Sequence, residues 1–248
     1  METGTDLGHD FAPLAGQAVP ALGADVHVWT VDLDGLKGKV DRGLLGPIER
    51  AKAETFVFEL DRQRYIAAHV ALRMVLARYT SQSPDELDIR ETPQGKPYLF
   101  GQVPAFNLSH SAGTALVAVA AGGHVGVDLE HVVPRHDALG IARSLFSRRE
   151  LELLEGMDEV ARRVAFHRLW VCREAVLKAA GTGLAGTGLE VAFGTDGETQ
   201  IIEPPDNFPG NIVIREFASS REQRGAVAWT VSDSSADAHF FGFSLPQS

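Results

Sequence analysis

Two acidic residues near the middle of the sequence have the type and the spacing of ligands for a divalent cation. Residues 126–130 read Gly-Val-Asp-Leu-Glu. Side chains alternate between the two faces of a strand, so Asp128 and Glu130 would share one face, about 7 Å apart. Carboxylate oxygens suit a hard cation such as Mg²⁺, which usually keeps open positions for phosphate. A half-buried strand with a solvated acidic face explains the same alternation, and five residues alone do not decide between the two interpretations.

A second set of chemically useful side chains is expected on a long helix over residues 158–180. Trp170, Glu174 and Lys178 follow one another at intervals of four residues, so they would share one face of that helix. Gly181 stands where a C-cap glycine is expected. Glu174 and Lys178 also form an i, i+4 pair in the favourable order, and a surface salt bridge explains this pair without a catalytic role.

Basic and polar residues stand out in three earlier segments. Lys96 stands in a turn beside a stiff proline, and Arg64 lies on a helix expected over residues 61–79. A single arginine on a helix usually belongs to a solvated face. Ser109 and His110 are neighbours on an expected strand, so their side chains point to opposite faces. This placement favours contacts with phosphate over a nucleophile and its base.

A local pattern at the start of a later helix explains one further acidic residue. Residues 147–150 read Ser-Arg-Arg-Glu, which is the pattern of a capping box. The side chain of Glu150 would reach back to the amide of Ser147. This local role is sufficient to explain Glu150 without any chemistry.

Two common enzyme motifs are absent, and a third occurs in the wrong context. Residues 181–186 match the dinucleotide fingerprint G-x-G-x-x-G, but they follow a helix and precede a strand, the reverse of the required order. The sequence has neither a G-x-x-x-x-G-K-[ST] loop nor a G-x-S-x-G elbow. We therefore expect neither a dinucleotide-binding domain nor a serine hydrolase.

The composition indicates a globular protein with an acidic balance. Apolar residues make up 44% of the 248 residues, and 33 acidic against 23 basic residues give a formal net charge of −10. Because no overall basic field for nucleic acid exists, an anionic ligand needs a local cluster of Lys and Arg or a metal. The single cysteine, Cys172, allows no disulfide within the chain, which fits a reducing, cytoplasmic setting. The longest apolar run, residues 115–121, is too short to cross a bilayer, and no signal-peptide pattern is present.

The elements that must position these residues are expected in the order strand, helices, strands, helices, strands. This order predicts an α+β chain of two similar halves that meet near residues 121–125, although no sequence repeat relates them. Residues 121–124 are expected to form a hairpin turn into the strand 126–130. The expected helices span residues 46–58, 61–79, 137–146, 147–155 and 158–180, and the expected strands span residues 25–33, 106–111, 115–121, 126–130, 189–193, 200–203, 211–217, 225–232 and 239–244.

Five clusters in one order resemble the Sfp-type 4′-phosphopantetheinyl transferases. The resemblance covers about residues 45–190. Each cluster alone is modest evidence, but five in the right order are specific. The clusters are Gly-Lys-Pro-Tyr at 95–98, Phe-Asn-Leu-Ser-His-Ser at 106–111, Gly-Val-Asp-Leu-Glu at 126–130, Phe-Ser-Arg-Arg-Glu at 146–150 and Trp-Val-Cys-Arg-Glu-Ala-Val-Leu-Lys at 170–178.

The resemblance implies a fold and a reaction. The fold would be two α+β halves related by a pseudo-twofold, with the active site in the cleft between them. Residues 21–124 would be the N-terminal half and residues 125–248 the C-terminal half. The resemblance does not reach residues 1–20, which contain Gly and Pro without periodicity and are expected to form a loose leader. The enzyme would transfer 4′-phosphopantetheine from coenzyme A to a serine of an acyl, peptidyl or aryl carrier protein, with release of 3′,5′-ADP. A monomer is implied, since both halves of the site would lie in one chain.

The resemblance also implies a role for each candidate residue. Asp128, Glu130 and Glu174 would bind Mg²⁺, Glu150 would act as general base, and Lys178 would lie near the pyrophosphate. Lys96, Ser109 and His110 would contact the phosphates of the nucleotide, and Arg64 would contact its adenosine end. Arg173 departs from the family, which usually has lysine at this place, so charge is kept but the compact ammonium is not.

Two alternatives stay open, together with the site of carrier docking. A Mg²⁺-dependent phosphohydrolase acting on coenzyme A-like nucleotides would use the same carboxylates with water as acceptor. A non-catalytic coenzyme A-binding protein would bind tightly without transfer. Because carrier proteins are commonly acidic, the segments that hold Arg143, Arg148 and Arg149 are the predicted docking surface.

Overall fold

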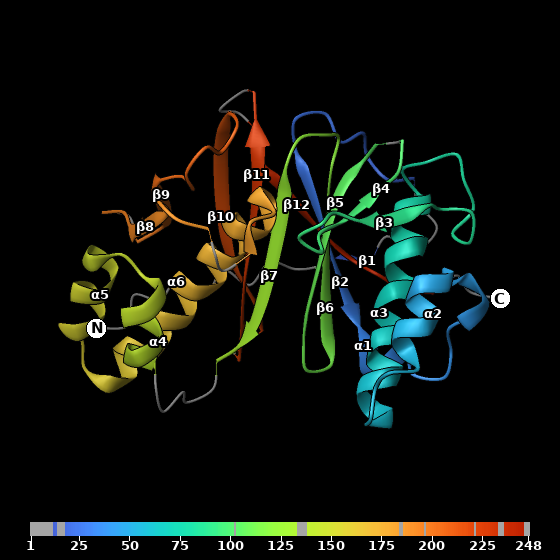
Figure 1. Cartoon of the computed structure of the whole chain (residues 1–248), viewed down its shortest axis with the longest axis horizontal. Helices are drawn as coiled ribbons and strands as arrows, with labels where there is room; N and C mark the ends of the chain where they lie inside the picture. Colours follow the sequence, from blue (N-terminus) through green and yellow to red (C-terminus); the bar gives the residue numbers. More distant parts are fainter. Residues whose placement is uncertain are drawn as a thin grey trace. The chain divides into compact units, whose positions relative to one another are not determined.

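The chain folds as an α+β protein of several small sheets and separate helices (Figure 1). The computed structural model describes residues 12–13, 18–101, 103–132, 138–183, 186–195, 197–220, 222–232 and 236–245. In this described part, no helix is both long enough and apolar enough to cross a membrane.

The described chain divides into two compact units, which we name after their longest helices. The α3 unit holds the described residues up to Gly123 together with those from 236 onward, and the α6 unit holds those from 124 to 232. The last strand belongs to the α3 unit because it pairs with the second strand of the chain. The units therefore differ from the expected halves, 21–124 and 125–248, at the C-terminal end.

The α3 unit is built on a sheet of five strands within the described residues. The order is β1-β12-β2-β6-β5; β12 runs parallel to β1 and β2, and β6 runs antiparallel to β2 and β5. The bounds are β1 Ala12–Pro13, β2 Val26–Asp32, β5 Ala105–Ser111, β6 Thr114–Ala120 and β12 Ala238–Gly242.

One long helix and several short elements complete the α3 unit. The helix α3 packs fully buried Leu72 and Leu76 against Trp29 of β2 and Val117 of β6. Burial of such side chains is worth about 1.5–3 kcal/mol each. The bounds are α1 Leu33–Leu36, the 3₁₀ helix η1 Arg42–Leu44, α2 Pro47–Ala53, α3 Glu59–Ala77, β3 Ile89–Glu91 and β4 Pro97–Leu99.

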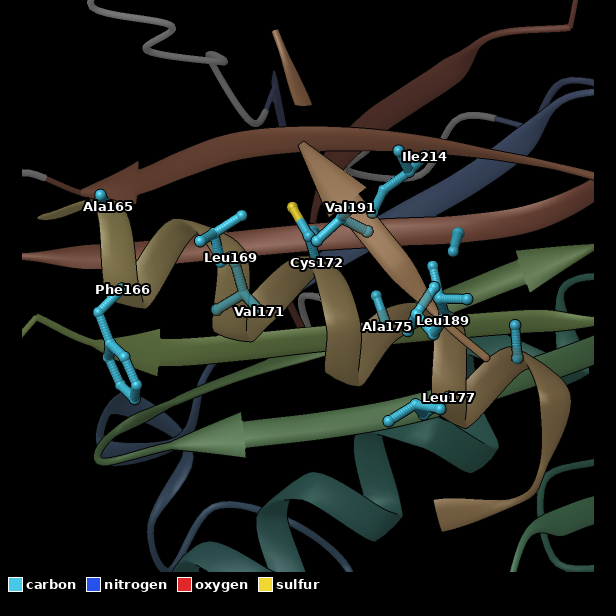
Figure 2. Close-up of a cluster of buried hydrophobic side chains, with 14 of the residues drawn as sticks. Ala165, Phe166, Leu169, Val171, Cys172, Ala175, Leu177, Leu189, Val191 and Ile214 are labelled. Atoms are coloured by element: carbon cyan, nitrogen blue, oxygen red, sulfur yellow. The ribbon is translucent and has the colours of Figure 1, made fainter. Parts of the chain in front are cut away.

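The α6 unit has an antiparallel sheet covered by its own long helix. The sheet order is β10-β11-β7, and α6 packs on all three strands. Leu169 and Cys172 of α6 are fully buried in this core, and Ile214 of β10 belongs to the same cluster of buried residues (Figure 2). The bounds are β7 Val125–His131, α4 Ala138–Leu145, α5 Arg148–Glu155, α6 Glu159–Ala180, β8 Glu190–Phe193, β9 Thr199–Glu203, β10 Asn211–Ser220 and β11 Gln223–Val231.

Most expected elements are confirmed within a few residues, including the capping box at Ser147 and the left-handed C-cap at Gly181. The expected hairpin at residues 121–124 is wrong, because β6 pairs with β2 and β5 whereas β7 pairs with β11. A turn-rich sequence between two strands favours a hairpin locally, and only the distant partners exclude it.

Three other expectations need correction or lie outside the described residues. The helix expected over 46–58 ends at Ala53, where the hydroxyl of Thr55 donates to the carbonyl of Lys52 and the chain turns before α3. Residues 12–13 of the expected leader form β1, and residues 1–11 and 14–17 lie outside the described part. Residue 137, the expected first residue of a helix, also lies outside it.

Candidate functional site

The site begins with a glycine that lets a helix approach a strand. A Cβ atom on Gly126 would overlap the carbonyl oxygen of Ala175 and the amide nitrogen of Ala179. The backbone of α6 therefore lies directly on β7, a separation that only glycine allows. This close packing determines which side chains of α6 reach the acidic residues of the strand.

Two side chains of α6 contact the two carboxylates of β7. The ammonium of Lys178 donates to Oδ1 of Asp128 at 2.6 Å, and Nε1 of Trp170 donates to Oε1 of Glu130 at 3.2 Å. Asp128 is 4% exposed, so its charge needs this partner. The sequence predicted the helix face and the strand face separately, and the structure brings the two faces together.

Glu174 lies between these two contacts along α6, and its environment disfavours its negative charge. Burial raises the pKa of Glu174, and the carboxylates of Asp128 and Glu130 raise it further, while the ammonium of Lys178 opposes them. The three predicted metal ligands are thus close enough to repel one another. A divalent cation would relieve this repulsion, so the chemistry of the donor set fits Mg²⁺.

The carboxylates are not assembled into a complete metal site. Among the described residues, no group of three or more His, Cys, Asp and Glu side chains is arranged to hold a metal ion. The ammonium of Lys178 contacts Oδ1 of Asp128. Binding of Mg²⁺ therefore stays a prediction, which rests on the chemistry of the donors.

Glu150, the predicted general base, is buried, and both of its carboxylate oxygens accept hydrogen bonds. Its side chain is 1% exposed and accepts from the amide of Ser147 at 2.6 Å and from the amide of Val191 at 3.2 Å. Nη1 of Arg173 donates to both carboxylate oxygens, at 3.1 and 2.9 Å. These contacts confirm the capping box and add a buried ion pair that sequence reasoning missed. The role as general base stays a prediction.

Arg173 uses the geometry that a lysine lacks. Besides Glu150, its guanidinium donates to the carbonyls of Leu189 at 2.9 Å and Leu145 at 2.6 Å. A planar fork can satisfy three acceptors in different directions at once, whereas an ammonium is a compact point charge. Arginine at this place therefore has a structural explanation.

Arg64 of the α3 unit is held by a partner that the sequence did not indicate. Its Nε and Nη2 donate to Asp34 at 3.0 and 2.8 Å, and Lys37 lies 3.2 Å from the same carboxylate. A Cβ atom on Gly113 would overlap Asp34, so this ion pair lies against the turn between β5 and β6. Ser109 precedes that turn on β5. No local pattern marks Asp34, because its partner lies 30 residues away.

The remaining predicted phosphate contacts are on β5 and on the turn before β4. Ser109 is buried and His110 is exposed, which confirms that neighbouring strand residues face opposite sides. The turn before β4 is closed by the amide of Lys96, which donates to Oγ1 of Thr92 at 3.1 Å, and by Gly95 with φ +83°. Burial lowers the pKa of Lys96 to about 8.

The structure therefore divides the predicted residues into two sets. The α6 unit holds the carboxylates and Lys178, and the α3 unit holds the predicted phosphate contacts. The first set is Asp128, Glu130, Glu150, Glu174 and Lys178, and the second set is Arg64, Lys96, Ser109 and His110.

Comparison with known proteins identifies matches over most of the chain. Residues 124–232 match the family model of the 4′-phosphopantetheinyl transferase superfamily, and residues 40–123 match that of the 4′-phosphopantetheinyl transferase N-terminal region. Over 170 residues the chain is 35% identical to the 4′-phosphopantetheinyl transferase HetI of Nostoc, covering 66% of this chain and 72% of the relative. It is also 30% identical over 170 residues to the 4′-phosphopantetheinyl transferase Sfp of Bacillus subtilis, covering 66% and 74%. A putative 4′-phosphopantetheinyl transferase of Synechocystis is 35% identical over 148 residues, covering 58% and 60%.

Proposed function

The chain belongs to the 4′-phosphopantetheinyl transferase superfamily, and we propose that it transfers 4′-phosphopantetheine from coenzyme A to a serine of a carrier protein. It is an enzyme of that class. The serine oxygen forms a bond to the phosphorus of the phosphopantetheine, and the pyrophosphate bond breaks. The leaving group is 3′,5′-ADP, and the serine proton passes to a base or to solvent.

The observation that carries this function is the meeting of β7 and α6 at Gly126. It places a buried carboxylate, two further carboxylates and an ammonium in one small region. Phosphoryl transfer depends on positioning and on charge stabilisation more than on covalent catalysis. This cluster supplies the charged groups for that task.

We assign a role to each residue of the cluster. Asp128, Glu130 and Glu174 would hold Mg²⁺, which when bound would offset negative charge on the pyrophosphate and on the leaving nucleotide. The ammonium of Lys178 donates to Asp128 and would contact the pyrophosphate. Trp170 orients Glu130 through its indole N–H. Each of these contacts lies within the α6 unit.

The nucleotide contacts are proposed on the α3 unit. Arg64 would bind the adenosine end of coenzyme A, while Lys96, Ser109 and His110 would bind its phosphates. These four residues supply local donors and positive charge in a chain whose net charge is −10. The pseudo-twofold relation of two transferase halves, 21–124 and 125–248, and a site in the cleft between them belong to the same proposal.

The partners and the setting also belong to the proposal. Coenzyme A is the donor, and acyl, peptidyl or aryl carrier proteins are the acceptors. The enzyme would act as a cytoplasmic monomer, without nucleic acid or membrane. Arg143, Arg148 and Arg149 are exposed and paired with Glu155, Glu152 and Glu190, respectively. We propose that this arginine surface docks the carrier.

The family resemblance implies Glu150 as the general base, whereas its contacts in the structure favour a different role. A base must lie within hydrogen-bond reach of the proton that it takes. At 1% exposure, with both oxygens bonded, Glu150 would first have to release a buried partner.

The reaction is tested by the intact mass of an apo carrier protein after incubation with the enzyme, coenzyme A and Mg²⁺. We expect a gain of one phosphopantetheine, about 340 Da, that is lost with EDTA and with Glu174→Ala, since metal-held phosphate is the basis of transfer. Consumption of coenzyme A without any carrier would instead support a phosphohydrolase. Tight binding that survives Glu174→Ala, with no mass gain on several unrelated carriers, would support a binding protein.

A further inference from the structure

A buried glutamate–arginine pair occurs in both units of the chain. In each unit the glutamate is the third residue of a short helix, and the arginine lies on the long helix that follows. In the α3 unit this device begins at the short helix α2, whose third residue is Glu49. The amide of Gly46 donates to Oε2 of Glu49 at 2.6 Å, and Nε of Arg73 donates to the same oxygen at 2.6 Å. Nη1 of Arg73 also donates to the carbonyls of Pro84 at 2.9 Å and Leu87 at 3.1 Å.

The α6 unit has a corresponding glutamate–arginine arrangement. The third residue of its short helix α5 is Glu150, and the amide of Ser147 donates to Oε2 of Glu150 at 2.6 Å. Arg173 of the long helix binds the glutamate and two carbonyls. In each unit one of these carbonyls lies just before a strand, at Leu87 before β3 and at Leu189 before β8.

The positions correspond along the chain as well as in their contacts. Each glutamate stands at the third position of its short helix. The steps from Glu59 to Arg73 in α3 and from Glu159 to Arg173 in α6 are both fourteen residues. All four residues are buried, with exposed fractions of 7% or less for the whole residue.

The residues next to each device differ in chemical type. Met74 follows Arg73, whereas Glu174, a proposed metal ligand, follows Arg173. In the α3 unit the pair thus serves the fold without a neighbouring carboxylate to assist. The shared contacts, from the amide before the short helix and from the arginine of the long helix, have the same explanation in the α6 unit. The second oxygen differs, because Oε1 of Glu49 pairs with His69 at 3.1 Å whereas Oε1 of Glu150 accepts from Val191 and Arg173. Both oxygens of Glu150 are therefore bonded within the α6 unit.

We infer that Glu150 and Arg173 form a structural clamp, in which Glu150 is a positioning residue and not the general base. The clamp fixes the rotation of α6 about its axis, because Arg173 is bonded to the segments before α5 and before β8. Adjacent helix residues differ by about 100° around that axis, so fixing Arg173 directs Glu174, and with it Lys178, toward β7. This inference rests on the proposed function, which gives Glu174 and Lys178 their roles.

The α3 unit supplies matched controls for the test. Glu150→Gln keeps the size of the side chain and one carbonyl acceptor but removes the basic carboxylate, and Glu49→Gln makes the same change in the other device. Arg173→Lys and Arg73→Lys form a second matched pair. The readouts are the temperature of thermal unfolding, the kcat of transfer, the Mg²⁺ concentration for half-maximal rate and the dependence of kcat/KM on pH.

A clamp and a base give different results. For a clamp we expect both glutamine variants to lower the unfolding temperature by similar amounts. Glu150→Gln should lower kcat less than tenfold, keep the acid limb of the pH profile and raise the half-maximal Mg²⁺ concentration, which Glu49→Gln leaves unchanged. A fall in kcat of about 100-fold or more, with the unfolding temperature and Mg²⁺ dependence unchanged, is the signature of a lost general base and overturns the inference.

If Glu150→Gln folds poorly, the lysine variants Arg173→Lys and Arg73→Lys still test the clamp. Arg173→Lys retains the charge but loses the fork, so we expect a lower unfolding temperature, matched by Arg73→Lys. Unchanged unfolding temperatures in both would overturn the clamp. The unfolding temperature does not depend on the reaction, so it tests the clamp independently of activity. Absence of transfer by the wild-type enzyme would overturn the proposed function but not the clamp.

Discussion

At the scale of single residues, we expect Lys96 to take up a proton when coenzyme A binds. Its pKa is lowered to about 8 by burial, so near this pH the unliganded protein holds the ammonium only in part. A bound phosphate favours the charged form and raises the pKa. Between the two pKa values the complex holds more protons than the unliganded protein, and affinity for coenzyme A therefore falls as pH rises through about 8.

We expect this loss to approach tenfold per pH unit above pH 8, as the uptake of one proton requires. Calorimetry in two buffers of different ionisation enthalpy at pH 8 measures the proton directly. In Lys96→Arg the cation stays charged throughout, so the proton uptake and the pH dependence should both disappear. Equal binding enthalpies in the two buffers for the wild type would contradict the role of Lys96.

The predicted and the missed residues differ in the range of their interactions. The faces that carry Asp128 and Glu130 on β7 and Glu174 and Lys178 on α6 follow from periods of two and of nearly four residues, so the sequence alone placed them correctly. The pairing of Arg64 with Asp34, 30 residues away, follows from no local period. Buried ion pairs of this kind depend on how elements pack, which a single sequence does not reveal.

At the scale of elements, the site depends on the contact between α6 and β7 at Gly126. In Gly126→Ala the new methyl group meets backbone atoms of Ala175 and Ala179, which cannot move aside as a side chain can. We expect α6 to shift away from β7, with a loss of about 1–3 kcal/mol in the free energy of unfolding. The shift also separates Lys178 from Asp128, so transfer should fall more than stability alone explains.

Gly156→Ala is the matched control in the same unit. A Cβ atom at Gly156, the C-cap of α5, would lie 3.6 Å from its nearest neighbour, which is ordinary contact distance. Chemical denaturation and transfer rates at a temperature where both variants are folded give the comparison. If Gly126→Ala matches Gly156→Ala in both, the close approach of α6 does not determine the site.

The elements were more predictable than their pairing. Helices α3, α5 and α6 begin and end within about two residues of the expectation, because caps and apolar periods are local signals. The sheet partners were not predictable in this way: β7 pairs with β11, about a hundred residues later, rather than with its neighbour β6. Likewise, the recurrence of the Glu–Arg clamp became evident only from contacts, since residues 46–49 and 147–150 share little sequence beyond the glutamate.

At the scale of the whole molecule, the net charge of −10 opposes the approach of an acidic carrier protein. Docking must therefore use a local surface of opposite sign. Arg148 and Arg149 are the most exposed of the proposed arginines, with side-chain exposures of 92% and 67%. Their pairing with glutamates at the surface is weak, so a carrier carboxylate can compete for them.

Reversal of both charges tests this surface. In Arg148→Glu with Arg149→Glu we expect KM for the carrier to rise several-fold while KM for coenzyme A stays the same, because rim charges act mainly on encounter and orientation. The effect should shrink at about 0.5 M salt, where screening is stronger. Lys39→Glu with Arg42→Glu changes the total charge equally on the α3 unit. An equal rise in carrier KM in both double variants would assign the effect to net charge, and docking at α5 would then be wrong.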